Sequence, residues 1–105
     1  MKYYRLKKQA DFQKLFGRGK RAFSPSLTLL YRPSEKPIMG ISLGKKHGKA
    51  VQRNRIKRLL REAYRAEFGA MKGTYSVVLI PKVADEYSLK TYRAHLKWMI
   101  EKEKL

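Results

Sequence analysis

The chain has no cysteine and only eight acidic residues among its 105. Without cysteine it forms neither a disulfide framework nor a thiolate metal site, a composition that fits a reducing compartment. Long apolar runs are also missing, because the longest, residues 77–80, is far shorter than the ~20 residues that span a bilayer. Residues 1–12 lack the apolar stretch of a secretory signal. We therefore expect a cytoplasmic protein without a membrane segment.

Basic residues dominate the charged residues of the chain. The 26 Lys and Arg residues give a formal net charge of +18, so the folded chain repels itself unless a polyanion compensates the charge. The length fits one domain, residues 1–105. With 43% hydrophobic residues, including seven Tyr, four Phe and one Trp, the chain has enough core-forming side chains to fold. These features predict one folded domain that binds nucleic acid.

Hydrophobic spacing and turn residues predict seven helices and strands. They are a helix at residues 6–16 that ends at GRG, where Gly17 and Gly19 permit left-handed backbone angles, strands at 20–23, 27–32 and 37–44, a long helix at 50–68, a strand at 74–81, and a helix capped by Ser88. The order α-β-β-β-α-β-α, with a βαβ unit between residues 37 and 80, predicts a small single-domain α+β sandwich. Trp98 is expected to pack the last helix onto the sheet.

The long helix has one apolar side and one basic side. At ~100° per residue, Ile56, Leu60 and Tyr64 fall on one arc and the cations fall on the opposite arc. Residues 36–61 contain no Asp or Glu, so the intrahelical ion pairs of an ordinary solvated helix face cannot form. Arginine, whose planar group suits phosphate contact and base stacking, predominates. The pattern favours nucleic-acid contact over a solvated surface.

The preceding segment GKKHGK, residues 44–49, places two glycines among lysines. Its backbone can therefore lie close to a phosphate, beside the free N–H groups of the helix N-terminus. His47 lies in this loop, where it can contact phosphate. The spacing is not that of a nucleotide-hydrolysing loop. Because the chain shows neither clustered carboxylates nor a histidine pair, we expect no catalytic residue and no protein-bound metal.

The segment KKHGKAVQRNRIKRLLREAYR, residues 45–65, strongly resembles the signature of the bacterial ribonuclease P protein subunit. The resemblance extends over the whole chain and includes DFQKLFGRGKR, residues 11–21. It implies that the chain does no chemistry itself but assists a catalytic RNA that removes the 5′ leader of precursor transfer RNA. The implied partners are these two RNAs, without a required protein partner, and the implied Mg²⁺ is held mainly by RNA. It also implies a ribosomal-protein-like fold with a left-handed βαβ crossover.

The resemblance assigns residues to two surfaces. The surface facing the catalytic RNA comprises Lys45, Lys46, Lys49, Arg53, Asn54, Arg55, Lys57, Arg58 and Arg61. The leader is expected in a cleft between the first helix and the sheet, lined by Phe12, Phe16 and Tyr31. An ungapped alignment places Leu30 at the family's aromatic strand position and Tyr31 one step along, which reverses the face.

Alternatives stay open for the residues and for the function. Phe12 and Phe16 either contact the leader or pack the core, and partial exposure would favour the leader. A ribosomal protein would share the size, charge and α+β build, and a DNA-binding regulator would suit the arginines. A DNA-binding regulator would use residues 50–68 as its recognition helix, but this chain lacks the preceding helix and tight turn of a helix-turn-helix.

Overall fold

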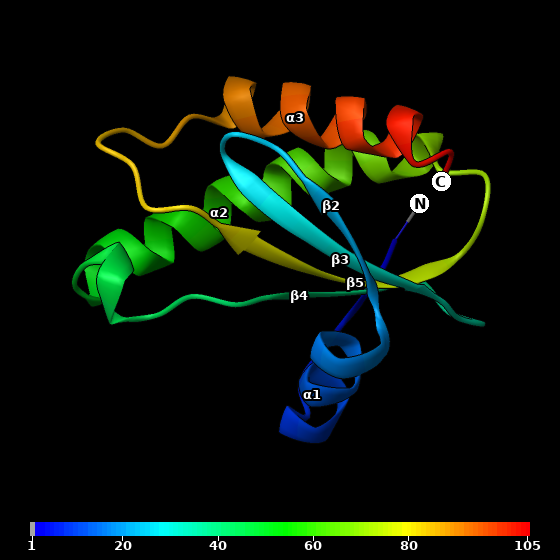
Figure 1. The fold of residues 1–105 in the computed structure, drawn as a ribbon. Coiled ribbons are helices and arrows are strands. Elements are labelled where there is room, and N and C mark those ends of the chain that lie inside the picture. The colour runs from blue at the N-terminus through cyan, green and yellow to red at the C-terminus, as the bar shows by residue number, and fades with distance from the viewer. Residues whose placement is uncertain (1) are drawn as a thin grey trace.

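Residues 2–105, which the computed structural model describes, form a five-stranded sheet and three α-helices (Figure 1). The elements are β1 Tyr4–Arg5, α1 Gln9–Arg18, β2 Lys20–Phe23, β3 Leu27–Pro33, β4 Ile38–Ile41, the 3₁₀ turn η1 Lys45–His47, α2 Ala50–Glu67, the 3₁₀ turn η2 Phe68–Ala70, β5 Tyr75–Pro81 and α3 Leu89–Lys102. The predicted order α-β-β-β-α-β-α is confirmed, and the short strand β1 precedes it.

The strands lie side by side in the order β1-β4-β5-β3-β2. β4 pairs parallel with β5, and α2 connects them, so the predicted βαβ unit is confirmed. β3 pairs antiparallel with β5 on its other side and with β2 at the sheet edge. β5 is therefore central, which explains its nearly continuous apolar sequence VVLI.

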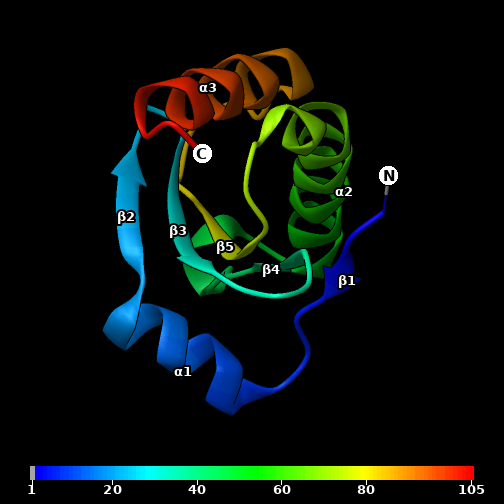
Figure 2. The same cartoon turned by 90° about the vertical axis from the view of Figure 1, so that its right-hand side faces the viewer.

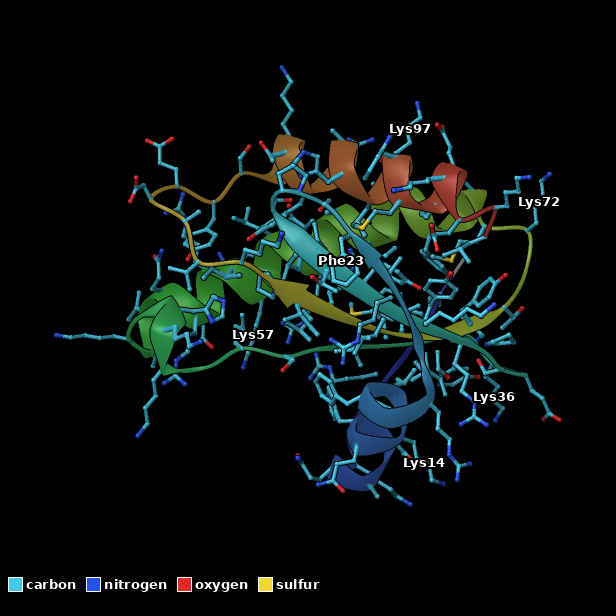
Figure 3. All side chains as sticks on the ribbon, viewed as in Figure 1. Lys14, Phe23, Lys36, Lys57, Lys72 and Lys97 are labelled. Atoms are coloured by element: carbon cyan, nitrogen blue, oxygen red, sulfur yellow. The ribbon has the colours of Figure 1, made fainter. Side chains whose placement is uncertain are left out.

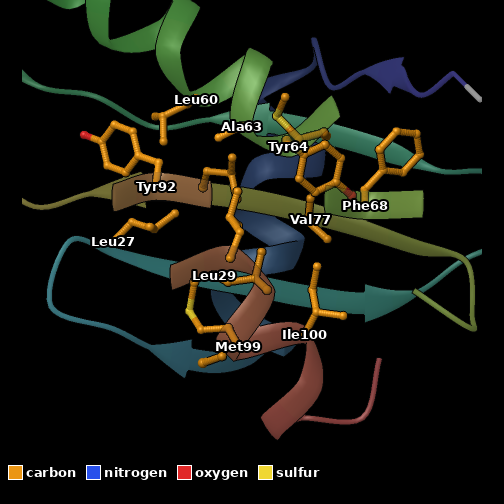
Figure 4. Close-up of a cluster of buried hydrophobic side chains, with 14 of the residues drawn as sticks. Leu27, Leu29, Leu60, Ala63, Tyr64, Phe68, Val77, Tyr92, Met99 and Ile100 are labelled. Carbon is orange, nitrogen blue, oxygen red and sulfur yellow. The ribbon is translucent and has the colours of Figure 1, made fainter. Parts of the chain in front are cut away.

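Helices α2 and α3 cover one face of the sheet, and α1 lies on the other face (Figure 2). The main core lies under α2 and α3, where Leu29 and Val77 of the sheet meet Leu60, Tyr64 and Ile100 of the helices (Figure 4). The apolar arc predicted for α2 is confirmed, since its buried residues are Ile56, Leu60, Ala63 and Tyr64. The basic side of α2 is consequently turned outward.

A smaller cluster holds α1 against the opposite face. Leu15 of α1 packs with Leu30 of β3 and Val78 of β5. The ring of Phe12 lies directly on the backbone of Gly40 in β4, because a Cβ built at that glycine would come within 2.8 Å of the ring. A side chain at residue 40 would therefore displace Phe12.

Two local features need a different explanation from the one that the sequence suggested. Helix α1 ends at Arg18, within the expected GRG segment, but Gly19 has φ −74° and does not use the left-handed angle that glycine permits. A glycine is needed there because a Cβ would lie 2.6 Å from the Leu15 carbonyl oxygen. Trp98 does not pack onto the sheet but is 47% exposed, with the Lys102 Nζ 4.7 Å from its ring centroid. The buried stripe of α3 passes through Leu96, Met99 and Ile100, which leaves residue 98 on the outer side.

Candidate nucleic-acid interface

Helix α2 presents an open basic face. Arg58 and Arg65 are exposed and Arg61 is half-buried. Residues 2–105 form one salt bridge, between Arg93 and Glu67. No cation on the basic face of α2 therefore lies within 4 Å of a carboxylate oxygen in that part of the chain. The first turn of α2 carries no acidic residue either, which leaves the positive end of the helix dipole uncompensated. The face therefore retains its full charge for an outside partner.

A groove of about 750 Å³ runs along this face. One wall is formed by Lys57, Arg61 and Arg65 of α2, and the floor includes Gly40 of β4 with Phe12 of α1. The N-terminal segment forms the other wall through Lys2, Tyr3, Arg5 and Leu6. Because Lys57 and Arg61 were assigned to the catalytic-RNA surface and Phe12 to the leader surface, the structure joins the two predicted surfaces in one groove.

A second, shallower hollow of about 410 Å³ continues along the outer side of α2. It shares Lys57, Arg61 and Arg65 with the groove and adds Asn54, Arg58 and the acid Glu62. The two remaining predicted arginines line neither hollow. Arg55 is exposed, and Arg53 is half-buried in the first turns of the helix.

The loop before α2 is fixed by His47. This imidazole is buried, and its Nε2 donates to the Pro81 carbonyl oxygen at 2.7 Å while its Nδ1 accepts from the Gly44 N–H at 3.1 Å. Both ring nitrogens are therefore used, and neither is free for the phosphate contact that the place of His47 in the loop made possible. The ring instead ties the loop to the end of β5, while Lys45, Lys46 and Lys49 remain exposed around it.

Gly48 completes the loop with φ 98°, an angle that side-chain-bearing residues rarely adopt. The backbone turns there directly into the first turn of α2, whose N-cap, Lys49, has no side-chain capping bond. The N–H groups at this end of the helix are thus available to an anion.

Phe12 and Phe16 both lie on α1 and are both partly open. Phe12 is half-buried, with its ring on Gly40 in the floor of the groove. Phe16 is 38% exposed one turn further along. This partial exposure favours a binding role over simple core packing for the pair.

Tyr31 lies on the wrong face for the predicted cleft. It is 7% exposed on the side covered by α2 and α3, and its hydroxyl donates to Glu103 Oε1 at 2.7 Å. Burial raises the pKa of Tyr31 to about 12, and the hydrogen bond to Glu103 adds to the shift. Leu30, on the opposite face, packs with α1. The alternation of the strand therefore removes Tyr31 from the leader surface.

The sequence reasoning missed the N-terminal wall of the groove. Lys2 and Arg5 add two cations to it, and Tyr3 packs edge-on against Tyr64 and Phe68, with ring centroids 5.2 and 5.5 Å apart. The pairing of Tyr4 with Ile38 holds this segment at the sheet edge. The concentration of aromatic and basic residues in KYYRL was the available signal.

Residues 2–105 contain no group of three or more His, Cys, Asp or Glu that could hold a metal ion. No helix within those residues has the length and apolar character needed to cross a membrane.

A basic helix beside a groove that combines cations with an aromatic ring defines a small α+β nucleic-acid-binding protein. Comparison with known families then identifies which family of nucleic-acid-binding proteins this is. Residues 1–104 match the family model described as Ribonuclease P, and the chain belongs to that family.

Relatives and solved structures agree with this family. The chain is 43% identical over 89 residues to the ribonuclease P protein component of Clostridium kluyveri, covering 80% of this chain and 79% of the relative. It is 36% identical over 104 residues to that of Bacillus velezensis, covering 96% and 90%. The fold is similar to the Staphylococcus aureus RNase P protein, with TM-score 0.82, 27% identity and coverage of 98% and 97%. It is also similar to the Thermotoga maritima RNase P protein, with TM-score 0.80, 28% identity and coverage of 92% and 96%.

Proposed function

We propose that the chain is the protein subunit of ribonuclease P, which binds the catalytic RNA and the 5′ leader of precursor transfer RNA and assists removal of the leader. The observation that carries the proposal is the groove in which Lys57 and Arg61 of α2 lie beside Phe12 of α1. Cations there suit a phosphate backbone, and the ring suits an unpaired base. The phosphodiester chemistry is assigned to the RNA, and the chain itself is not catalytic.

The catalytic RNA is bound by residues of the basic loop and of α2. They are Lys45, Lys46 and Lys49 of the loop, and Arg53, Asn54, Arg55, Lys57, Arg58 and Arg61 of α2. The loop is fixed by His47 and the helix by its buried stripe, so the backbone that carries these side chains is held in place before RNA arrives. Such preorganisation reduces the entropy lost on binding.

The leader lies in the groove and along α1, where its bases stack on Phe12 and Phe16. Stacking tolerates any base, so leader sequence would matter little. Lys57 and Arg61 lie where the leader and the catalytic RNA meet, because these two residues border both the groove and the outer hollow. The protein thereby holds substrate and catalytic RNA in register, which lowers the entropic cost of reaction.

Mg²⁺ is held by phosphate oxygens of the RNA, a ligand type that it prefers. The protein supplies charge that complements those phosphates, so less Mg²⁺ is needed when it is bound. The assembly works in the cytoplasm, which fits a chain without cysteine.

Phe12→Leu tests the leader assignment. Leucine retains an apolar side chain over Gly40 but loses the stacking face, so affinity of the assembled ribonucleoprotein for precursor transfer RNA should fall by about fivefold or more. Affinity for mature transfer RNA, which has no leader, should not change. Trp98→Ala, which removes an exposed ring from the outer side of α3, is the matched control.

An equal loss with precursor and mature transfer RNA would contradict leader contact by Phe12. A chain that fails to associate with the catalytic RNA would favour a ribosomal or other structural RNA-binding role.

A further inference from the structure

Strand β2 leaves an aromatic ring uncovered on the face of the sheet that carries α1. Phe23 is 58% exposed, whereas the preceding Ala22 is buried in the core under α2 and α3. Successive strand residues point to opposite faces, so Phe23 and Arg21 share the α1 face. The hydrogen bond from Arg21 Nη2 to the Phe16 carbonyl oxygen, at 3.5 Å, agrees with this placement.

The strand register places Phe23 just beyond the area that α1 covers. Arg21 pairs with Leu30, which lies under α1, and Phe23 pairs with Thr28 in the next row on the same face. Arg21 thus links the end of α1, at the Phe16 backbone, with Phe23 two residues further along β2, and we name these three residues the edge strip. Figure 3 shows Phe23 between Lys97 of α3, above it, and Lys14 of α1, below it.

The surroundings of the edge strip are basic without compensation. Residues 12–34 contain no Asp or Glu. They contain the cations Lys14, Arg18, Lys20, Arg21 and Arg32. β2 is the edge strand of the sheet, so its outer side has no neighbouring strand. An exposed ring among cations suits single-stranded nucleic acid, whereas a protein partner would require a broader apolar patch.

We propose that Phe23 is an additional stacking platform for the single-stranded leader, with Arg21 contacting the adjacent phosphate. The proposal rests on the proposed function and extends the leader path from Phe12, past Phe16, to the sheet edge. On the α1 face of the sheet, β3 has Leu30 at the position where the resemblance led us to expect an aromatic residue. Phe23 supplies an exposed aromatic ring on that same face. Because every base has a stacking face, the platform accepts RNA of any sequence.

The experiment measures affinity of the assembled ribonucleoprotein for precursor transfer RNAs whose leaders increase one nucleotide at a time. The variants are Phe23→Ala, Phe23→Trp, Phe12→Leu and Trp98→Ala, each checked for an unchanged melting temperature. With the native chain, affinity should rise in two steps as the leader reaches Phe12 and later Phe23. Phe23→Ala should remove the later step only, with a loss of about fivefold or more, and Phe23→Trp should restore it.

Trp98→Ala should leave both steps intact. If Phe12→Leu removes the early step while Phe23→Ala leaves the later one unchanged, the platform is overturned and the proposed function stands. If no leader length raises the affinity of the native assembly, the proposed leader function itself fails. An equal effect of Phe23→Ala on mature transfer RNA would also overturn the platform.

Discussion

Removing two charges from the shared wall of the groove should change how binding to the catalytic RNA depends on salt. Lys57 and Arg61 lie one turn apart on α2, and neither is neutralised by an acid within residues 2–105. Each phosphate contact contributes about 0.7 to 0.9 to the slope of log affinity against log salt concentration. Lys57→Gln combined with Arg61→Gln should therefore reduce the slope by about 1.4 to 1.8.

This change is large enough to measure. Between about 50 and about 200 mM salt, the native chain should lose about tenfold more affinity than the double variant loses. The free energy of unfolding should stay equal or rise, since the variant reduces the self-repulsion of a chain with a net charge of +18. Weaker binding would then not be due to misfolding.

The assay is equilibrium binding of the chain to the catalytic RNA over a salt series. Lys90→Gln combined with Lys97→Gln is the matched control, because it removes the same charge from exposed positions on α3. Its slope should stay close to that of the native chain. Equal slopes for both double variants would refute the reasoning, because only total charge, and not the groove, would then determine binding.

Two further predictions concern buried groups. His47→Ala should weaken binding to the catalytic RNA, because the basic loop loses both hydrogen bonds of the imidazole. His47→Asn retains an acceptor toward the Gly44 N–H and should restore part of the affinity. An alanine variant that binds the catalytic RNA with native affinity would contradict this prediction. Tyr31→Phe should lower the free energy of unfolding by about 1 kcal/mol, because it removes the hydrogen bond to Glu103. Tyr92→Phe should not lower it, because the buried Tyr92 hydroxyl has no hydrogen-bond partner within residues 2–105. Burial raises the pKa of both tyrosines from 10.0 to about 12, so their ionisation does not affect the free energy of unfolding below pH 10 and lowers it as the pH rises toward 12, where the unfolded chain releases these protons first. Urea unfolding across this range should show a smaller alkaline loss in each phenylalanine variant, and an unchanged loss would count against burial of that hydroxyl.

The sequence predicted features that depend on local spacing. The two sides of α2 follow from the helical repeat alone, and Ile56, Leu60 and Tyr64 are buried as expected. The βαβ unit follows from the order of strand, helix and strand, which allows few other arrangements. The charge of the site could also be predicted, because residues 36–61 contain no acid that could neutralise it.

Features that depend on distant neighbours could not be predicted in this way. His47 is buried because Pro81, 34 residues away, accepts its hydrogen bond. The face of Tyr31 depends on the register of β3, in which a shift of one residue exchanges Tyr31 with Leu30. β1 has two residues, too few to show a periodic pattern, and exists because Tyr4 pairs with Ile38. Long-range pairing decided each of these outcomes.

The central claim is that this chain supplies a charged binding surface to an RNA that does the chemistry. The most direct test is cleavage of precursor transfer RNA by the chain alone, the catalytic RNA alone and the two together, over a Mg²⁺ series. We predict no cleavage by the chain alone, and cleavage by the pair at a lower Mg²⁺ concentration than the RNA alone requires. Cleavage by the chain alone, or an unchanged Mg²⁺ requirement for the pair, would contradict the account.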